Sequence, residues 1–174
     1  MRKPRKLKEG ASYHVTARAN RQEMILSSPE LKDMFLHILS RAKKKYDFNC
    51  KNFCLMNNHI HLIIEPLKNT NLSRIMQWVL SVFAIHYNRK YHFTGHVWYD
   101  RFRSKIIQNI RQYYATFLYI ANNPVKAKIV RSPFDYTYSG IYHLRIGIYD
   151  ILERPPNDFL LFIWKKLREG DGER

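Results

Sequence analysis

Acidic residues are scarce in this chain of 174 residues, where 14 Asp and Glu stand against 30 Lys and Arg. The formal net charge is +16 at pH 7, and the isoelectric point is about 10.0. Such an excess of positive charge repels itself in the compact state and attracts polyanions. The charge therefore favours a nucleic acid as the partner, with an anionic membrane surface as the second possibility.

Long apolar runs are also missing. No stretch approaches the roughly 18–20 apolar residues of a membrane-spanning helix, and no hydrophobic segment follows the N-terminal charges. Internal repeats and low-complexity segments are absent, and the length fits one domain with a hydrophobic core of its own. We therefore expect a single-domain protein, no association with the membrane interior, and a cytoplasmic location.

Cysteine is limited to Cys50 and Cys54. Both fall in a segment that we expect to form a strand, where four positions correspond to about 13 Å. That separation is too large for a disulfide bond or for a shared zinc ion. We expect both thiols to be reduced and structural.

Hydrophobic periodicity and turn residues divide the rest of the chain into strands and helices. Ser28-Pro29-Glu30 has the features of a helix start, with a serine cap, a proline in the first turn and an acid near the positive end of the dipole. Asn57-Asn58 is typical of a tight turn between antiparallel strands. The expected strands are 12–18, 49–56, 59–65 and 101–108, and the expected helices are 28–45, 112–123 and one from Asn71 or Ser73 to about Tyr87, followed by a loop over 90–98.

The order strand, helix, strand, strand, helix, strand predicts an α+β fold, the ferredoxin-like sandwich. Its antiparallel sheet is expected to carry helices on one face, with helix 112–123 added to that core. Residues 1–9 form a basic N-terminal arm, 10–142 the domain, and 143–174 a C-terminal extension that packs on the domain or trails from it. Within the extension, residues 158–168 fit a short amphipathic helix.

Two histidines, His59 and His61, lie one residue apart in an apolar run. Side chains alternate along a strand, so both imidazoles project from one face while Ile60 and Leu62 project from the other. Two imidazoles about 6–7 Å apart at the backbone can converge on one divalent ion. A lone histidine there would more often be a hydrogen-bonded core residue, but the pair predicts a metal site. Glu65 shares the face but lies about 13 Å along the strand from His61, too far for a direct ligand.

Tyr119 and Asn123 are four positions apart in the third predicted helix, which places them on one face if the helix reaches Asn123. Pro124 disfavours helical geometry at the preceding residue, so the helix can end there and Asn123 can cap a following turn. A tyrosine beside a metal-polarised phosphate is a candidate nucleophile. The alternative, given 12 tyrosines in the chain, is a packing residue.

The strand expected at 101–108 carries cations at alternate positions, which places them in one row. Such a row can follow the phosphates of a nucleic acid, and the neighbouring aromatic residues can stack on bases. The alternative is a solvated edge strand whose charges discourage aggregation. The cations are Arg101, Arg103 and Lys105, and the aromatic residues are Trp98, Tyr99 and Phe102.

Taken together, these segments resemble the HUH single-strand endonucleases, and within them the single-tyrosine transposases of the IS200-like, REP-associated type. The resemblance covers roughly residues 10–142. The histidine pair and the Tyr-x-x-x-Asn-Pro-Val segment are its most specific elements. The matching segments are Tyr13-His14-Val15 with Arg18 and Arg21, Met56-Asn57-Asn58-His59-Ile60-His61-Leu62, Tyr87-Asn88, Gly95-His96-Val97-Trp98, Arg101-Phe102-Arg103-Ser104, Tyr119-Ile120-Ala121-Asn122-Asn123-Pro124-Val125-Lys126-Ala127 and Asp135-Tyr136-Thr137-Tyr138-Ser139.

The resemblance implies a specific chemistry. His59 and His61 would hold Mg²⁺ or Mn²⁺ against the scissile phosphate, and Tyr119 would be the nucleophile. Asn123 would be the third metal ligand, with Asn122 as the alternative. The reaction would be transesterification on single-stranded DNA, leaving a 5′-phosphotyrosine and a free 3′-hydroxyl that allows the strands to be rejoined.

The resemblance also implies DNA with hairpins as the partner, and it leaves monomer and homodimer open. The basic arm could reach into a hairpin groove or remain a solubilising tail. Two other functions stay open: a nucleic-acid-binding protein that no longer cuts, and a metal hydrolase that uses water in place of the tyrosine. The residues expected to contact DNA are Arg18, Arg21, Trp98, Arg101, Arg103, Lys105 and Lys126.

Overall fold

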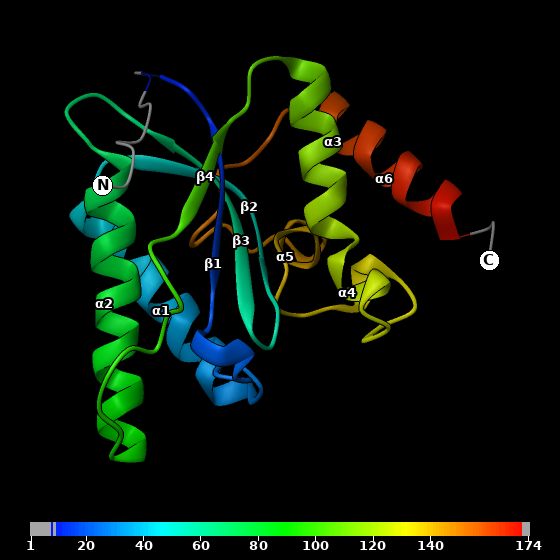
Figure 1. Cartoon of the computed structure of the whole chain (residues 1–174). Coiled ribbons are helices and arrows are strands. Elements are labelled where there is room, and N and C mark those ends of the chain that lie inside the picture. Colours follow the sequence, from blue (N-terminus) through cyan, green and yellow to red (C-terminus); the bar gives the residue numbers. More distant parts are fainter. Residues whose placement is uncertain (1–7, 9, 172–174) are drawn as a thin grey trace.

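The computed structural model describes residue 8 and residues 10–171 of the chain (Figure 1). Apart from residue 8, the expected basic arm therefore lies outside the described residues. The strands are β1 (Tyr13–Arg18), β2 (Phe48–Leu55), β3 (His59–Pro66) and β4 (Arg103–Ile106). The helices are α1 (Pro29–Lys45), α2 (Leu72–Tyr91), α3 (Ile110–Ala121), α4 (Asn123–Lys126), α5 (Gly140–Ile146) and α6 (Asn157–Asp171), with 3-10 turns η1 (Asn20–Gln22) and η2 (Pro133–Asp135).

The first two helices begin where their capping residues predict. The Ser28 hydroxyl accepts a hydrogen bond from the Leu31 backbone N–H at 3.3 Å, and Asn71 Oδ1 accepts one from the Ser73 N–H at 2.7 Å. These bonds satisfy donors that the first turn of a helix leaves free. Helix α2 runs further than expected, to Tyr91, and ends where His92 adopts a left-handed conformation. The predicted loop at 90–98 therefore begins two residues too early.

The sheet has the order β2-β3-β1-β4, and every neighbouring pair is antiparallel. This confirms the ferredoxin-like arrangement and the tight β2–β3 hairpin. Strand β4 is shorter than the predicted 101–108. The Asp100 carboxylate accepts a hydrogen bond from the Arg101 backbone N–H at 2.6 Å, and such a local bond competes with strand pairing. On the N-terminal side of Asp100, the chain pairs once more with the residue after β1, because Trp98 forms an isolated antiparallel bridge to Ala19.

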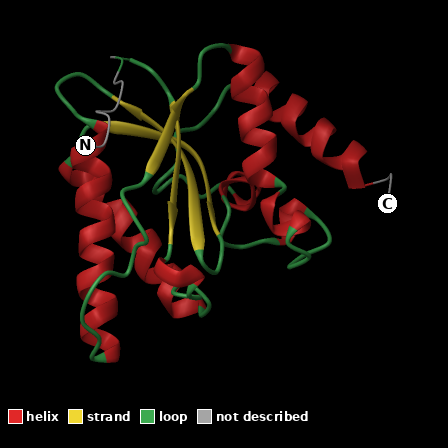
Figure 2. Ribbon diagram, viewed as in Figure 1, coloured by secondary structure: helices red, strands yellow, loops and turns green. Residues whose placement is uncertain are grey.

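Alternate residues of β1 and β3 face two different layers. Helices α1 and α2 lie on one side of the sheet and α3 on the other (Figures 1 and 2). The side chains toward α1 and α2 are apolar and buried, and they form the centre of the core: Val15, Ala17, Ile60, Leu62 and Ile64. The opposite face, toward α3, carries His14, His59 and His61. One face of these strands is therefore apolar, whereas the other, called the polar face below, carries histidines next to buried Ile63.

The C-terminal segment packs against the helix that carries Tyr119. Helix α6, which fits the amphipathic helix expected at 158–168, places Phe159 against Tyr113 and Phe117 of α3, with ring centroids 5.5 and 5.0 Å apart. The expected boundary between residues 142 and 143 falls inside α5. The division into arm, domain and extension stays a prediction, but residues 143–169 lie on the domain in this structure.

Both cysteines are free and fully buried. Burial raises the pKa of the Cys50 thiol to about 12 and also raises the pKa of the Cys54 thiol. Thiols that stay protonated are poor nucleophiles and poor metal ligands, which agrees with a structural role.

Within residues 8 and 10–171, no helix combines the length and the apolar character needed to cross a membrane. The cellular location stays a prediction.

Candidate active site

The two histidines of β3 share one face, as the alternation predicts. The ring centroids of His59 and His61 are 5.0 Å apart, with the planes nearly perpendicular. His61 is buried, whereas His59, at the start of the strand, is half-buried. The Asn58 side-chain oxygen lies 2.6 Å from His59 Nδ1. The hairpin turn therefore supplies a hydrogen-bond partner to the first histidine as well as reversing the chain.

A third histidine, His14 of β1, joins the pair. Its ring stacks on that of His61 with centroids 5.3 Å apart and planes 25° apart, and its Nε2 lies 3.0 Å from His61 Nδ1. The sheet register explains the contact, because Thr16 is the Cα partner of His61 and His14 lies two residues before it on the same face. The sequence pattern alone does not identify His14 as a site residue. Alternation within Tyr13-His14-Val15 predicts that His14 projects from the face opposite to Tyr13 and Val15. It does not show which residue of β3 lies beside His14, because that depends on the register of β1 against β3.

Helix α3 brings Tyr119 to this cluster. The Tyr119 ring centroid is 5.5 Å from that of His61 and 5.9 Å from that of His14, both in edge-on geometry. Its side chain is 42 % exposed, so one part touches the histidines while another stays open to a substrate. Lys126 of α4 places its Nζ 5.2 Å from the centre of the same ring. The tyrosine therefore lies at the edge of the histidine cluster, between two imidazoles and a cation.

The position of α3 is held from both sides. Asn52 of β2 is fully buried, and its Nδ2 donates to the Phe117 carbonyl oxygen at 3.2 Å. Gly140 of α5 approaches Asn52 so closely that a Cβ on the glycine would lie 2.3 Å from Asn52 Oδ1. Helix α6 packs on the other side through Phe159. Tyr114 also packs on Phe159, so it turns away from Tyr119, as the helical spacing predicts.

Asn123 follows Tyr119 across the end of α3. The helix ends at Ala121, two residues before the predicted end, and Asn122 is both the last cap of α3 and the first cap of α4. The expectation that Asn123 caps the following turn is therefore wrong. Instead, Asn123 Nδ2 donates to the Tyr119 carbonyl oxygen at 2.8 Å. This bond uses the amide nitrogen and not the oxygen that a hard cation takes as a ligand.

The imidazoles of the cluster are held neutral by their surroundings. Burial, followed by the charges of His59, His14 and Arg18, lowers the pKa of His61 to about 3. Burial also lowers the pKa of His59, aided by Arg18, and that of His14, aided by Lys105. Neutral imidazole is the form that binds a metal ion.

One buried atom of the cluster has no partner among the described residues. His61 Nε2 is buried and makes no hydrogen bond. Leaving a buried polar atom unsatisfied costs roughly 1–3 kcal/mol, so such an atom requires an explanation. A nitrogen lone pair in this position fits a divalent cation as the missing partner.

The donors do not form an all-protein metal cage. Within the described part of the chain, no group of three or more His, Cys, Asp and Glu side chains is placed to hold a metal ion. His14 makes a hydrogen bond to His61, and Glu65 is engaged with Lys51 at 3.2 Å and with Asn49 at 3.1 Å. The available set is therefore the two imidazoles of β3, with an amide oxygen, water or substrate needed to complete it.

Three of the predicted DNA-binding cations share the face of the histidine pair. In the register of the sheet, Arg18 is the partner of His59, Lys105 the partner of His14, and Arg103 the partner of Thr16. All three are exposed. Lys105 and Tyr119 also line one cavity of about 360 Å³, together with His14, Gln112 and Thr116. Cations therefore surround the tyrosine and the histidines on the open side of the sheet.

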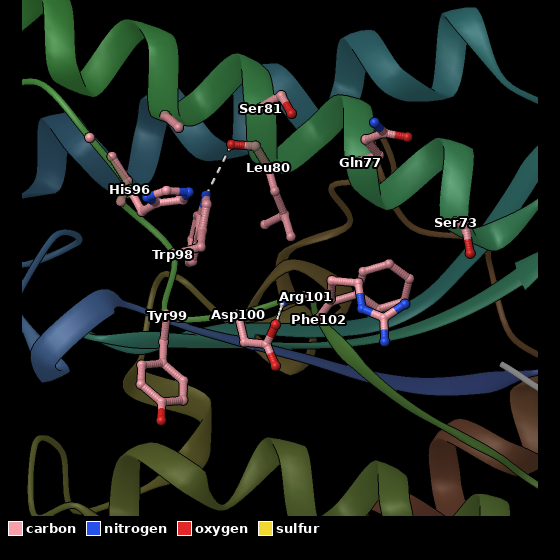
Figure 3. A pocket seen from close by; sticks show the side chains of 13 residues that line it. Ser73, Gln77, Leu80, Ser81, His96, Trp98, Tyr99, Asp100, Arg101 and Phe102 are labelled. Carbon is pink, nitrogen blue, oxygen red and sulfur yellow. Dashed lines mark hydrogen bonds between the residues drawn. The ribbon is translucent and has the colours of Figure 1, made fainter. Parts of the chain in front are cut away.

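Trp98 and Arg101, also predicted to contact DNA, line a cavity other than that of Tyr119. A cavity of about 720 Å³ separates α2 from residues 95–102 and is lined by Trp98 and Arg101 (Figure 3). The Trp98 indole points toward α2 and donates to the Leu80 carbonyl oxygen at 2.9 Å. It is only 9 % exposed, whereas Tyr99, which points away from α2, is 69 % exposed and is the more accessible aromatic ring. Arg21 is exposed in η1.

The chain matches the family model described as "Transposase IS200 like" over residues 8–123. The chain belongs to the family of IS200-like transposases. The match includes β1, the histidine pair of β3, β4 and Tyr119, and it ends at Asn123.

Comparison with solved structures agrees on the fold of this IS200-like transposase. A REP-associated tyrosine transposase bound to a REP hairpin is similar with a TM-score of 0.70 and 21 % identity, over 90 % of this chain and 93 % of that chain. A protein from Deinococcus radiodurans assigned to the transposases has a TM-score of 0.49 and 14 % identity, over 74 % of this chain and 92 % of that chain. No curated protein sequence matches the chain. The first of these likenesses supports the fold.

Proposed function

We propose that this IS200-like transposase cleaves and rejoins single-stranded DNA by transesterification, with Tyr119 as the nucleophile. The observation that carries the proposal is the ring contact between Tyr119 of α3 and His61 of β3, at 5.5 Å between centroids. These two residues come from different layers of the fold, and packing alone gives no reason for a half-exposed phenol to lie beside buried, neutral imidazoles. Both come from one chain, so one copy contains the nucleophile and the histidine pair.

In this proposal, His59 and His61 hold Mg²⁺ or Mn²⁺, and Asn123 supplies a third ligand through its oxygen. Two imidazoles and an amide oxygen accept either ion. The partnerless Nε2 of buried His61 supports the assignment. When bound, the ion supplies charge neutralisation at a non-bridging phosphate oxygen. Asn122, the alternative ligand, caps both α3 and α4, and the side chain that reaches back to Tyr119 is that of Asn123.

Tyr119 attacks the scissile phosphorus in line with the leaving 3′-oxygen. The bond from the phenol oxygen to phosphorus forms and the bond from phosphorus to the 3′-oxygen breaks, while the phenol loses its proton and the 3′-oxygen gains one. The product is a 5′-phosphotyrosine, which keeps the energy of the ester bond. A 3′-hydroxyl of another strand can therefore displace the tyrosine and rejoin the DNA without a nucleotide cofactor.

The cations around the site position the DNA backbone. Arg18, Arg103 and Lys105 lie on the same face of the sheet as the histidines, and Lys126 lies beside the Tyr119 ring. Phosphate contacts of this kind fix the register of a strand without reading its sequence. Arg21 and Arg101 are exposed and extend the surface beyond the reacting phosphate, and Trp98 contributes at the cavity wall beside Arg101. The structural neighbour described as bound to a REP hairpin supports DNA with a hairpin as the substrate.

The proposal is tested by replacing Tyr119 with phenylalanine. Purified protein is incubated with 5′- and 3′-labelled single strands that carry a hairpin, with Mn²⁺ or with EDTA, and covalent adducts are separated on denaturing gels. We expect an adduct that needs the metal and disappears in Tyr119→Phe. Tyr114→Phe is the matched control, because it removes a hydroxyl from the same helix away from the histidines.

Two other results of this adduct assay would indicate different functions. Cleavage without an adduct that survives Tyr119→Phe would indicate water as the nucleophile and would contradict the proposal. Tight binding of the hairpin without cleavage, in any of the metal conditions, would indicate a protein that binds DNA without cutting it.

A further inference from the structure

We infer that His14 and Asn58 are positioning residues that hold His61 and His59 in the tautomer with the proton on Nδ1, so that both Nε2 lone pairs face the metal ion. The inference rests on the proposed metal centre and adds a function for two residues outside the ligand set. The evidence is the hydrogen bonding of the ring nitrogens: in each histidine Nδ1 has a partner within the protein.

The partners of both histidines lie at the same ring atom. His61 Nδ1 lies 3.0 Å from His14 Nε2, and His59 Nδ1 lies 2.6 Å from Asn58 Oδ1. An amide oxygen only accepts hydrogen bonds, so the contact to Asn58 requires the proton on His59 Nδ1. A neutral imidazole carries one proton, and His59 Nε2 is then a lone-pair donor.

For His61 the hydrogen bond to His14 permits either direction, and a cation at the buried Nε2 atom favours one of them. If His14 donated, a neutral His61 would carry its proton on Nε2, and a buried N–H would face a site without an acceptor. With His61 Nδ1 as the donor, the same buried atom is a lone pair that a cation satisfies. A ligating histidine commonly gives its other N–H to a partner that fixes its orientation.

The surroundings of His14 and Asn58 suit this role. The His14 ring stacks on His61 and touches the Tyr119 edge, which fixes its orientation between the strand and the helix. Asn58 is held at the turn, because its backbone oxygen accepts a hydrogen bond from the Ala19 N–H at 2.8 Å. Two rigid elements, the β2–β3 hairpin and β1, therefore orient one imidazole each.

The test is made on the whole chain without DNA, so that it does not depend on cleavage. Long-range proton–nitrogen NMR correlations at neutral pH show which ring nitrogen carries the proton, and calorimetry with Mn²⁺ alone gives the affinity for metal. We expect the Nδ1–H form at both histidines of the metal-free protein. In His14→Phe, which keeps an aromatic ring without an acceptor, we expect His61 to populate both tautomers and Mn²⁺ to bind about 10–100-fold more weakly.

Conservative variants separate positioning from loss of structure. In His14→Gln the Oε1 atom can accept the same N–H, so we expect much of the affinity to return, and in the same way Asn58→Asp should bind Mn²⁺ better than Asn58→Leu. His86→Phe is the matched control, because His86 is an exposed histidine of α2 that contacts its own helix at the Val82 oxygen. Thermal melts by circular dichroism show whether each variant is folded.

The possible failures are distinguishable. An Nε2–H form of His59 or His61 in the wild type would overturn the inference, as would unchanged Mn²⁺ affinity in folded His14→Phe and Asn58→Leu. If Mn²⁺ does not bind to the wild type, or binds equally well in His59→Ala, the proposed metal centre fails. In that case the NMR spectra of the metal-free protein still show whether His14 and Asn58 determine the tautomers of His61 and His59.

Discussion

The two faces of the sheet use the same strands for different purposes. Toward α1 and α2, Val15, Ile60 and Leu62 are apolar and completely buried. Toward α3, their immediate neighbours His14, His59 and His61 form a polar cluster that meets Tyr119. Because side chains alternate, His14 and His61 each lie between two buried residues, and His59 lies beside one, so the core restricts the positions of all three. A chain with one large apolar face can therefore place imidazoles accurately on the other.

Substitutions at two adjacent residues of β3 test whether the two faces have separate roles. His61→Ala should reduce adduct formation by at least about 100-fold, because loss of a ligand weakens binding of an ion that supplies several kcal/mol of charge stabilisation. The free energy of unfolding should change little or even rise in metal-free buffer, since the partnerless buried Nε2 is removed. Adduct yield and urea unfolding are measured on the same preparation. Retention of activity in a folded His61→Ala protein would contradict the role of this face.

Leu62→Ala should show the opposite pattern. Leu62 is fully buried, and truncating a buried leucine lowers the free energy of unfolding by about 2–5 kcal/mol. Adduct formation per folded molecule should remain close to that of the wild type at low temperature. Urea titration gives the loss of stability. A specific loss of activity without a loss of stability would show that the two faces are not separable.

The histidines of the polar face should also make the stability depend on pH, which the apolar face cannot do. Burial lowers the pKa of His61 to about 3 from an ordinary value of 6.5, and the pKa values of His59 and His14 are lowered as well. At pH values between the folded-state pKa of about 3 and the ordinary value of 6.5, His61 binds a proton in the unfolded chain but not in the folded chain. The free energy of unfolding therefore falls as the pH falls below about 6.5. One such group contributes a slope of up to about 1.4 kcal/mol per pH unit. Above about pH 6.5 these histidines are neutral in both states, and this loss of stability is absent.

This slope is measured by urea unfolding at pH 7 and pH 5 in EDTA. The wild type should lose more stability between the two values than His61→Leu, which lacks one of the groups. An equal loss in both proteins would mean that His61 is protonated as readily in the folded state as in the unfolded one.

The alternating pattern could be predicted from the sequence because it is local. The shared face of His59 and His61, the hairpin at Asn57-Asn58 and the order of strands and helices each follow from neighbouring residues, and the structure confirms them. The contact of His14 with His61 joins residues 47 positions apart and depends on the register of β1 against β3. No local pattern specifies that register to one residue.

The ends of elements were harder to predict for a related reason. Strand β4 begins later than expected, after the bond of Asp100 to the neighbouring backbone, and ends earlier, before the Gln108 N–H bonds to the Gln112 side chain; α3 ends two residues early where Asn122 caps it. Before β4 the Asp100 carboxylate bonds to a backbone N–H, and at the end of α3 the Asn123 amide bonds to the Tyr119 carbonyl oxygen, so single side chains compete with the ladder or helix hydrogen bonds. The position of Asn123 relative to the histidines is determined at such an end, and its role as a ligand stays a prediction.

The cations of the polar face should carry the salt dependence of DNA binding. Removing one phosphate contact reduces the slope of log affinity against log salt concentration by about 0.7 for a single strand. We expect this change in Arg103→Gln, because Arg103 lies on the face of the histidines. Lys165→Gln is the control, since Lys165 is an exposed cation of α6. Fluorescence anisotropy with a labelled hairpin at several salt concentrations gives both slopes. Equal slopes in the two variants would place the DNA on another surface.

The smallest effect is expected at Lys126, which approaches the polar face only through the Tyr119 ring. Its Nζ lies 5.2 Å from the ring centre, and a cation in this position at an exposed site contributes about a two- to fivefold effect. Lys126→Gln should therefore slow adduct formation by that factor while leaving stability unchanged, because the side chain is exposed. Lys128→Gln removes an equal charge two residues away and is the control for general attraction of DNA. If both variants slow the reaction equally at low salt and neither does at high salt, Lys126 acts only through overall charge, and its contact with the tyrosine has no separate role in the chemistry.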